Sequence, residues 1–331
     1  MRLGYALSSE EHTPLDLVRN ARRAEEIGFS FALISDHFHP WIERQGHSPF
    51  VWSVIGGIAQ ATQKLELGTG VTAPIIRTHP AIIAQAAATS AAMMPGRFFL
   101  GVGTGENLNE HIFGDRWPPH DIRSEMLAEA VKIMRMLWTG ETISYWGDYF
   151  DVEDARLFTL PDAPPPIVIA AGGPSSAELA GRIGDGLVCT SPEAELVEAF
   201  RSQSAGENGS DRPRYGKFTV CWAKTEKEAR STVFKGWPTS ALGGELNTEL
   251  RTFKHFEQAT KPFTEDQIAE SFVLGPDPEK HLQGIQEFVD AGFDHIYVHQ
   301  IGSDQDGFFK FYEKEILPKL KLSGKAAVKA S

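Results

Sequence analysis

The chain has 331 residues, of which 41% are hydrophobic and 23% charged, a composition typical of a globular protein rather than a disordered or collagen-like one. The formal net charge is −12, and no basic run could neutralise a phosphate backbone, so nucleic acid is not an expected partner. No apolar run reaches the roughly 18 residues of a membrane-spanning helix, and the N-terminus lacks the apolar core of a signal peptide. We therefore expect a cytoplasmic protein with no membrane partner.

Short apolar runs alternate with longer amphipathic runs along the chain. The short runs predict eight strands, at Leu3–Leu7, Phe31–Ile34, Leu65–Val71, Phe98–Val102, Pro166–Ala171, Gly186–Thr190, Lys217–Ala223 and His295–His299. The longer runs predict helices, at Pro14–Ile27, Pro49–Ala61, Pro80–Met93, Ile122–Trp138, Ser175–Ile183, Ala194–Gln203 and Pro278–Ala291, with a further helical stretch after the seventh strand. This alternation indicates βαβ units and a parallel sheet.

Eight strand–helix repeats close most simply into a (β/α)8 TIM barrel, an α/β fold whose chemistry lies at the carboxyl ends of its strands. A doubly wound sheet is the competing architecture, but the segment Ser8-Ser9-Glu10-Glu11 after the first strand lacks the glycines of a nucleotide fingerprint. We predict one barrel domain over residues 1–321, with a hairpin-like insertion at about 141–165 and a polar helical insertion at about 236–270. Residues 322–331 are predicted to form a flexible tail.

Two histidines follow the second predicted strand, in the stretch ISDHFHPW. The spacing of His37 and His39 is that of a metal pair in barrel-type hydrolases. Such a site needs further histidines after strands five and six, where this chain has Ala171-Gly172-Gly173 and Thr190-Ser191. The two cysteines lie in apolar runs without the spacing of a zinc site. A metal hydrolase is therefore an alternative that lacks its remaining ligands, and we predict no metal.

Asp36-His37 stands where a barrel carries out its chemistry, and a histidine suits general acid–base catalysis near neutral pH. A second acid, Glu106, follows the fourth strand in GVGTGENLNE. This segment differs from a dinucleotide loop because glutamate replaces the last glycine. Its alternating glycines would let a flat ring approach the backbone, whereas the alternative is a rim turn with a solvated acid.

The run IAAGGPSSAELAG leads from the fifth strand through Gly172-Gly173 into a helix that begins near Pro174. Unpaired amides and the helix dipole converge at such a start and favour an anion such as a phosphate. Gly-Gly-Pro-Ser is also a common way to begin a helix without any ligand.

Six segments, SDHFHPW, LGTGV, HPAIIAQAAAT, PGRFFLGVGTGENLNE, IAAGGP and GRIGDGLVCTS, occur in the order and spacing of the luciferase-like flavin and deazaflavin oxidoreductases. Within that family the chain resembles, over nearly its whole length, the coenzyme F420-dependent branch that includes the glucose-6-phosphate and alcohol dehydrogenases. The resemblance implies a (β/α)8 barrel with insertions, a deazaflavin cofactor, a small-molecule substrate and a homodimer.

The resemblance also implies roles for single residues. His37 would be the base that takes the hydroxyl proton as hydride leaves the substrate carbon, Trp41 would line the reaction pocket, and Glu106 would protonate or hydrogen-bond the ring nitrogen. A further set would hold the cofactor: Asp36, Gly70 and Val71 joined by a non-prolyl cis peptide, Thr104, Gly105, Asn109, Ala171, Gly172, Gly173 and Thr190.

One segment departs from the family pattern. The sugar-phosphate dehydrogenases have a lysine shortly after CTS that binds the substrate phosphate, whereas this chain has Glu193 and Glu195 there, which would repel a phosphate. Unless Arg251, Lys254 or Lys261 of the second insertion reach the substrate, an uncharged alcohol, a sugar or an enone-type acceptor is favoured over glucose 6-phosphate. We predict hydride transfer between F420 and an alcohol or sugar, or its carbonyl counterpart. The alternatives are an FMN-dependent luciferase-like monooxygenase and a non-catalytic deazaflavin-binding protein.

Overall fold

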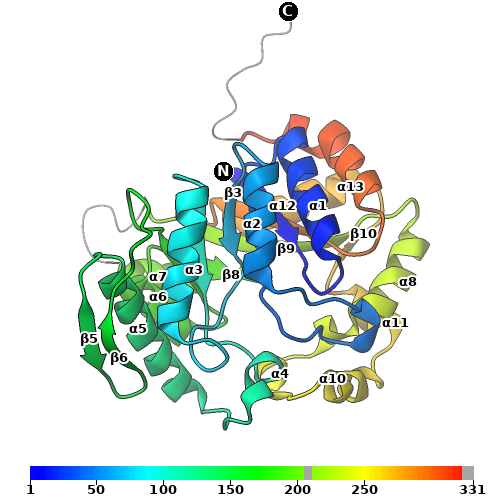
Figure 1. Cartoon of the computed structure of the whole chain (residues 1–331). Helices are drawn as coiled ribbons and strands as arrows, with labels where there is room; N and C mark the ends of the chain where they lie inside the picture. Colours follow the sequence, from blue (N-terminus) through cyan, green and yellow to red (C-terminus); the bar gives the residue numbers. More distant parts are fainter. Residues whose placement is uncertain (205–210, 323–331) are drawn as a thin grey trace, which may run out of the picture.

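The computed structural model describes residues 1–204 and 211–322. Its centre is a closed barrel of eight parallel strands (Figure 1). In order around the barrel these are β1 (Arg2–Leu7), β2 (Phe31–Ile34), β3 (Glu66–Thr69), β4 (Phe98–Val102), β7 (Ile167–Ala170), β8 (Gly186–Cys189), β9 (Arg214–Cys221) and β11 (His295–Gln300). Each strand pairs with the next, and β11 pairs with β1. The predicted TIM barrel is confirmed.

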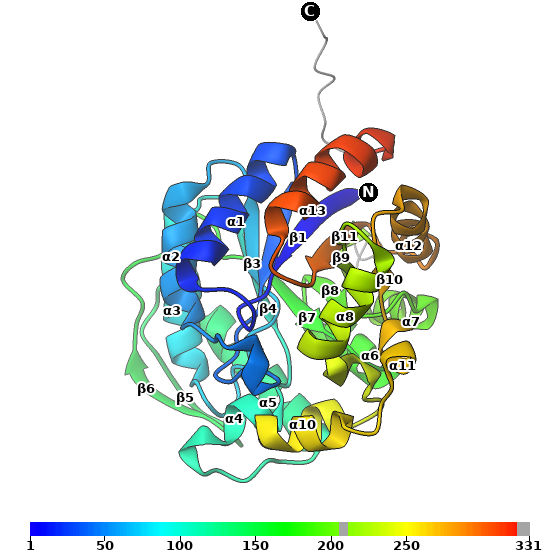
Figure 2. The ribbon, with the colours of Figure 1, turned by 90° about the vertical axis from the view of Figure 1, so that its right-hand side faces the viewer.

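Helices surround the barrel, as Figures 1 and 2 show from two directions. The longer helices are α1 (Pro14–Ile27), α2 (Val51–Ala61), α3 (Pro80–Met93), α5 (His120–Leu137), α6 (Pro174–Ile183), α7 (Ala194–Gln203), α8 (Glu226–Gly236), α12 (Pro278–Asp290) and α13 (Gln305–Phe311). Local sequence sets their ends. Helix α1, for example, begins after Thr13, whose hydroxyl accepts from the amide of Asp16, and stops at Gly28, which has φ of 103°.

Alternate strand residues point inward and fill the lower part of the barrel. This interior cluster comprises Ala6, Phe31, Leu33, Phe99, Val168, Val188, Tyr215 and Tyr297. Room for it comes from glycine, because a Cβ at Gly68 would lie 2.1 Å from the Phe99 ring. The barrel is therefore a packed core rather than a channel, and polar chemistry is confined to its mouth, the end formed by the carboxyl ends of the strands.

The two segments that the sequence predicts as insertions each contain secondary structure. The first contains an antiparallel hairpin, β5 (Ile143–Trp146) and β6 (Asp151–Ala155). The second contains η4 (Pro238–Ala241), α9 (Leu246–Glu249), α10 (Phe253–Thr260) and α11 (Glu265–Ala269). It is followed by β10 (Val273–Leu274), which pairs with the C-terminal end of β9. In both views α10 lies at the same end of the barrel as α4 (Asn107–Glu110), the short helix after β4.

Short helical turns complete the chain, at η1 (Glu43–Gln45), η2 (His111–Phe113), η5 (Tyr312–Ile316) and η6 (Leu317–Lys319). The clearest difference from expectation is β9, which begins at Arg214 rather than Lys217. A charged residue hides this strand start from a hydropathy pattern, but Arg214 is buried here against Asp294. The predicted tail lies, apart from Leu322, outside the described residues. No helix in the described part of the chain combines the length and apolarity needed to cross a membrane.

Candidate active site

A buried carboxylate faces an imidazole at the barrel mouth. Glu10 follows β1, His37 follows β2, and Glu10 Oε1 lies 3.2 Å from His37 Nδ1, with the two side chains 3% and 9% exposed. The Nδ1 atom is not aligned with this oxygen for an ideal hydrogen bond, and it has no other partner among the described residues. Glu10 is therefore the charged group that faces Nδ1 and orients the His37 ring.

Glu10 is held in its ionised form. Its second oxygen, Oε2, accepts hydrogen bonds from the hydroxyls of Ser8 (2.9 Å) and Ser35 (2.8 Å). Burial alone would raise the pKa of Glu10, but the facing His37 and these hydroxyls outweigh burial, so the pKa lies below its ordinary value. Near neutral pH a fixed carboxylate thus stands at Nδ1 of His37 and leaves Nε2 to exchange a proton with a ligand.

Trp41 lies between His37 and the second insertion. Its ring contacts His37 edge-on, with centroids 5.0 Å apart, and contacts Phe256 of α10 in the same manner at 5.2 Å. Gln45 links the loop that contains Trp41 to the end of α8. Its side chain accepts a hydrogen bond from the Trp41 amide and donates one to the carbonyl of Gly236. The insertion therefore sets the position of the aromatic wall next to the imidazole.

Asp36 belongs to a buried charge network behind the site. Its carboxylate accepts from the hydroxyl of Thr72 at 2.8 Å and from the guanidinium of Arg77 at 3.0 Å. Arg77 also bonds Glu110, which receives both the Arg77 amide and its Nε. Burial raises the pKa of Glu110 to about 7, although Arg77 opposes this. The contact of Asp36 with a cofactor stays a prediction.

Asn109 joins the loop after β2 to the loop after β4. It is 1% exposed, and its Oδ1 accepts from the amides of Phe38 and His39 at 2.9 and 3.1 Å. Its Nδ2 donates to Glu106 Oε2 at 3.4 Å. The His39 ring bonds the carbonyl of Leu108 through Nδ1. Asn109 therefore fixes the spacing between the His37 segment and the predicted ring-binding acid.

The neighbouring part of the mouth is built from glycine and small residues. The peptide bond between Gly70 and Val71 after β3 is cis, as the resemblance predicts. After β4, Thr104 precedes Gly105, which has φ of 69° and would place a Cβ 2.8 Å from that of Ala73. A larger side chain here would meet both strain and collision.

The helix start after β7 is open. Ala171 is bound to β8 through its amide, whereas an added Cβ at Gly172 or Gly173 would meet nothing within 4 Å. Gly173 is the N-cap of the ten-residue helix α6, and no side chain caps this helix. The first amides of α6 are thus available to an anion, as the sequence indicates.

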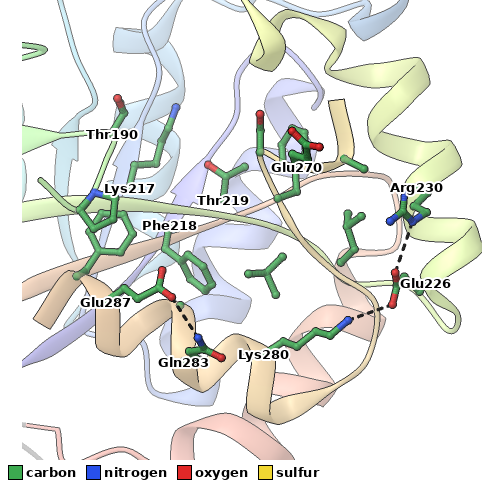
Figure 3. Close-up of a pocket in the computed structure, with 18 residues that line it drawn as sticks. Thr190, Lys217, Phe218, Thr219, Glu226, Arg230, Glu270, Lys280, Gln283 and Glu287 are labelled. Atoms are coloured by element: carbon green, nitrogen blue, oxygen red, sulfur yellow. Dashed lines mark hydrogen bonds and ion pairs between the residues drawn. The ribbon is translucent and has the colours of Figure 1, made fainter. Parts of the chain in front are cut away.

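A pocket of about 580 Å³ adjoins the mouth next to β8 and β9 (Figure 3). Thr190, an exposed residue that follows β8, lines it together with Lys217 and Thr219 of β9. Lys217 is partly buried and makes no ion pair within 4 Å among the described residues. Burial lowers the pKa of Lys217, while the charges of Glu10 and Glu106 oppose this. The pocket is therefore connected electrostatically to the His37 site.

The other cations of this pocket are already neutralised. Figure 3 shows Glu226 between Arg230 and Lys280, at 3.5 and 3.1 Å, and Arg230 also pairs with Asp266 at 2.9 Å. Glu270 adds a further carboxylate to the lining. Three cations of the second insertion were considered as ligands of a substrate phosphate. These residues, Arg251, Lys254 and Lys261, are exposed and do not line this pocket.

The mouth thus divides into two halves. The residues predicted to hold the cofactor follow β3, β4, β7 and β8, apart from Asp36, and we call this the cofactor half. Glu10, His37, Trp41 and Lys217 come from β1, β2 and β9, and we call the region formed by β1, β2, β9 and β11 the acid–base half. Neither Glu10 nor Lys217 was predicted as a site residue. The adjacency of β1 and β2 is the signal for Glu10, because it brings an acid after the first strand within reach of a histidine after the second.

The barrel and its mouth define the class of protein. A family model described as luciferase-like monooxygenase matches residues 1–295, and the chain belongs to this family. The chain is 35% identical to an F420-dependent glucose-6-phosphate dehydrogenase of Amycolatopsis mediterranei, over 98% of this chain and 100% of that protein. It is 36% identical to the enzyme of the same name from Mycolicibacterium gilvum, over 98% and 99% of the two chains.

Solved structures agree with this assignment. The fold is similar to that of an F420-dependent secondary alcohol dehydrogenase solved with an F420–acetone adduct, with a TM-score of 0.88 and 29% identity over 95% of this chain and 98% of that one. A coenzyme F420-dependent tetrahydromethanopterin reductase from Methanopyrus kandleri has a TM-score of 0.74 at 20% identity, over 96% and 99% of the chains. The latter likeness concerns the fold alone.

Proposed function

We propose that the chain is a coenzyme F420-dependent oxidoreductase that moves a hydride between the deazaflavin and a CH–OH group, or its carbonyl counterpart. The Glu10–His37 pair at the barrel mouth is the observation that carries this proposal, because oxidation of an alcohol needs a base at the hydroxyl. Relatives matched from end to end are F420-dependent dehydrogenases, and the structural neighbour at 29% identity is one as well.

The cofactor half fits a deazaflavin. The uncapped start of α6 with the open positions Gly172 and Gly173 would hold the phosphate of its tail. The Gly70–Val71 segment and the Thr104–Gly105 turn would lie against the ring, with Ala171, Thr190, Asp36 and Asn109 around it, and Glu106 would bond a ring nitrogen. When bound, the deazaflavin supplies a carbon that accepts hydride.

The chain's own residues supply the proton chemistry. Glu10 fixes the His37 ring through Nδ1 and stabilises the imidazolium that forms when Nε2 takes the hydroxyl proton. Trp41 closes the side of the site next to His37 and limits water there. We propose alcohol oxidation as the direction in which this base acts.

We further propose that the substrate is uncharged. A dianionic phosphate needs cations that are free to bind it, whereas Arg230 and Lys280 are paired with acids and Glu270 shares their pocket. Lys217 interacts electrostatically with the carboxylates of Glu10 and Glu106. This distribution of charge in the pocket supports an uncharged alcohol or sugar as substrate, rather than the sugar phosphate in the names of the curated relatives.

Titration of the purified protein with F420 and with FMN, followed by fluorescence, tests the cofactor. Tight binding of FMN without binding of F420 would assign the chain to the monooxygenase alternative. His37→Ala and a control, His39→Ala, then test catalysis with a series of alcohols. Loss of F420 reduction by about 100-fold or more in His37→Ala alone, with F420 affinity retained, is expected. Absence of turnover in the wild type with every alcohol would favour the non-catalytic binding protein.

We also propose that the protein acts in the cytoplasm as a homodimer. Two large apolar side chains near the starts of the neighbouring helices α2 and α3 support this, since Phe50 just before α2 is 65% exposed and Ile82 of α3 is 56% exposed. Light scattering of the wild type and of Ile82→Glu measures the assembly, and a monomeric wild type would refute it.

A further inference from the structure

A second imidazole–carboxylate pair stands on the other side of β1. Glu11 follows Glu10, and its Oε2 lies 3.4 Å from Nε2 of His299, which is on β11. Its Oε1 accepts from the amide of Gly302 at 3.2 Å. Strands β2 and β11 are the two neighbours of β1. Consecutive carboxylates therefore reach in opposite directions, Glu10 toward His37 and Glu11 toward His299.

The two pairs present opposite ring nitrogens. His37 directs Nδ1 to Glu10 and leaves Nε2 free, whereas His299 directs Nε2 to Glu11. Within the described part of the chain, Nδ1 of His299 has no hydrogen-bond partner. An imidazole whose Nε2–H donates to a carboxylate is an acceptor at Nδ1. Trp237 contacts the His299 ring edge-on, with centroids 4.9 Å apart, so the ring is held in place.

The second pair adjoins the pocket next to β9. His299 is paired in register with Thr219, and Thr219 lines that pocket together with Lys217 (Figure 3). The His299 side chain is 5% exposed and that of Glu11 is 11% exposed. His299 is thus next to a residue that lines the pocket, and this buried, oriented imidazole has no task in the proton transfer assigned to His37.

We propose that the Glu11–His299 pair binds a second hydroxyl of the substrate, which makes the substrate a polyhydroxylated alcohol such as a sugar or polyol. This inference rests on the proposed function and narrows it. The hydroxyl that is oxidised gives its proton to His37, and a hydroxyl on a neighbouring carbon donates a hydrogen bond to Nδ1 of His299. Glu11 is a positioning residue that holds Nε2 of His299 and so leaves Nδ1 as the acceptor.

Glycerol and 2-propanol form a matched pair of probes, because glycerol is 2-propanol with a hydroxyl on each neighbouring carbon. In the F420-loaded wild type we expect kcat/KM for glycerol to exceed that for 2-propanol by about tenfold or more, the value of one or two hydrogen bonds to an oriented group. Glu11→Gln and His299→Asn should each reduce this ratio to near one. The control His111→Asn, at the same end of the barrel but hydrogen-bonded to Asn107, should preserve it.

Binding separates this inference from the proposed function. Trp237 contacts His299, so tryptophan fluorescence of the F420-loaded protein is used to measure glycerol binding, whether or not hydride is transferred. Weaker glycerol binding in His299→Asn than in the wild type supports the second hydroxyl site even if no alcohol is oxidised. Equal preference for the two alcohols in the wild type, or glycerol binding that His299→Asn leaves unchanged, would overturn it.

Discussion

Replacing Glu10 by glutamine removes the charge that faces His37 and keeps the shape of the side chain. The carboxylate stands 3.2 Å from Nδ1 and is ionised near neutral pH. A hydrogen bond to a charged group contributes about 1.5–3 kcal/mol, which corresponds to a loss in kcat of about 10- to 150-fold. Glutamine can also present an N–H to Nδ1, which leaves the proton on Nε2 and brings the loss to the upper end of this range.

The assay is the initial rate of F420 reduction by an alcohol that the wild type oxidises, with F420 affinity measured separately by fluorescence. Glu10→Asp keeps the charge at a greater distance and should lie between the wild type and Glu10→Gln. The control Glu26→Gln changes an acid of α1 outside the mouth and should be neutral. A Glu10→Gln variant with wild-type kcat and an unchanged pH profile would refute the role of Glu10 in orienting the base.

Three further changes test other parts of the site. Asn109→Ala leaves two amides without their acceptor and should lower the free energy of unfolding by about 2 kcal/mol in urea. The raised pKa of Glu110, about 7, adds stability below the ordinary pKa of glutamate that is lost as pH rises through 7. Glu110→Gln should therefore flatten the decline in Tm between pH 5 and 8. Gly172→Asp should weaken F420 binding about tenfold in a fluorescence titration, because its carboxylate competes for the α6 amides, whereas Gly172→Asn should weaken it less.

The barrel could be predicted because the local sequence of each strand identifies it as a strand. Runs such as Phe31–Ile34 are apolar throughout, as expected for strands that are buried on both faces. The start of β9 escaped because Arg214 is a charged residue that is buried by a partner 80 positions away, Asp294. A hydropathy pattern contains no information about such a partner.

Site residues could be predicted where a residue type that suits the chemistry directly follows a predicted strand, as for His37 and for the glycines before α6. Glu10 was missed because its role depends on a neighbour relation between strands, which appears only when β1 and β2 are placed side by side. Arg77 was missed for a similar reason, since it joins Asp36 to Glu110 from a loop that has no motif of its own. Pairwise contacts of this kind follow from topology rather than from local sequence.

In the proposed mechanism, two consecutive residues support different tasks, one in catalysis and the other in substrate binding. Glu10 and Glu11 belong to one loop, yet each serves an imidazole on a different neighbouring strand. Insertion or deletion of one residue in this loop would therefore disturb both pairs at once, whereas Glu11→Gln leaves the base intact. Lys217 interacts electrostatically with Glu10 of the acid–base half and with Glu106 of the cofactor half. We expect changes at His299 to alter substrate preference alone, and changes at Lys217 to alter cofactor affinity and catalysis together.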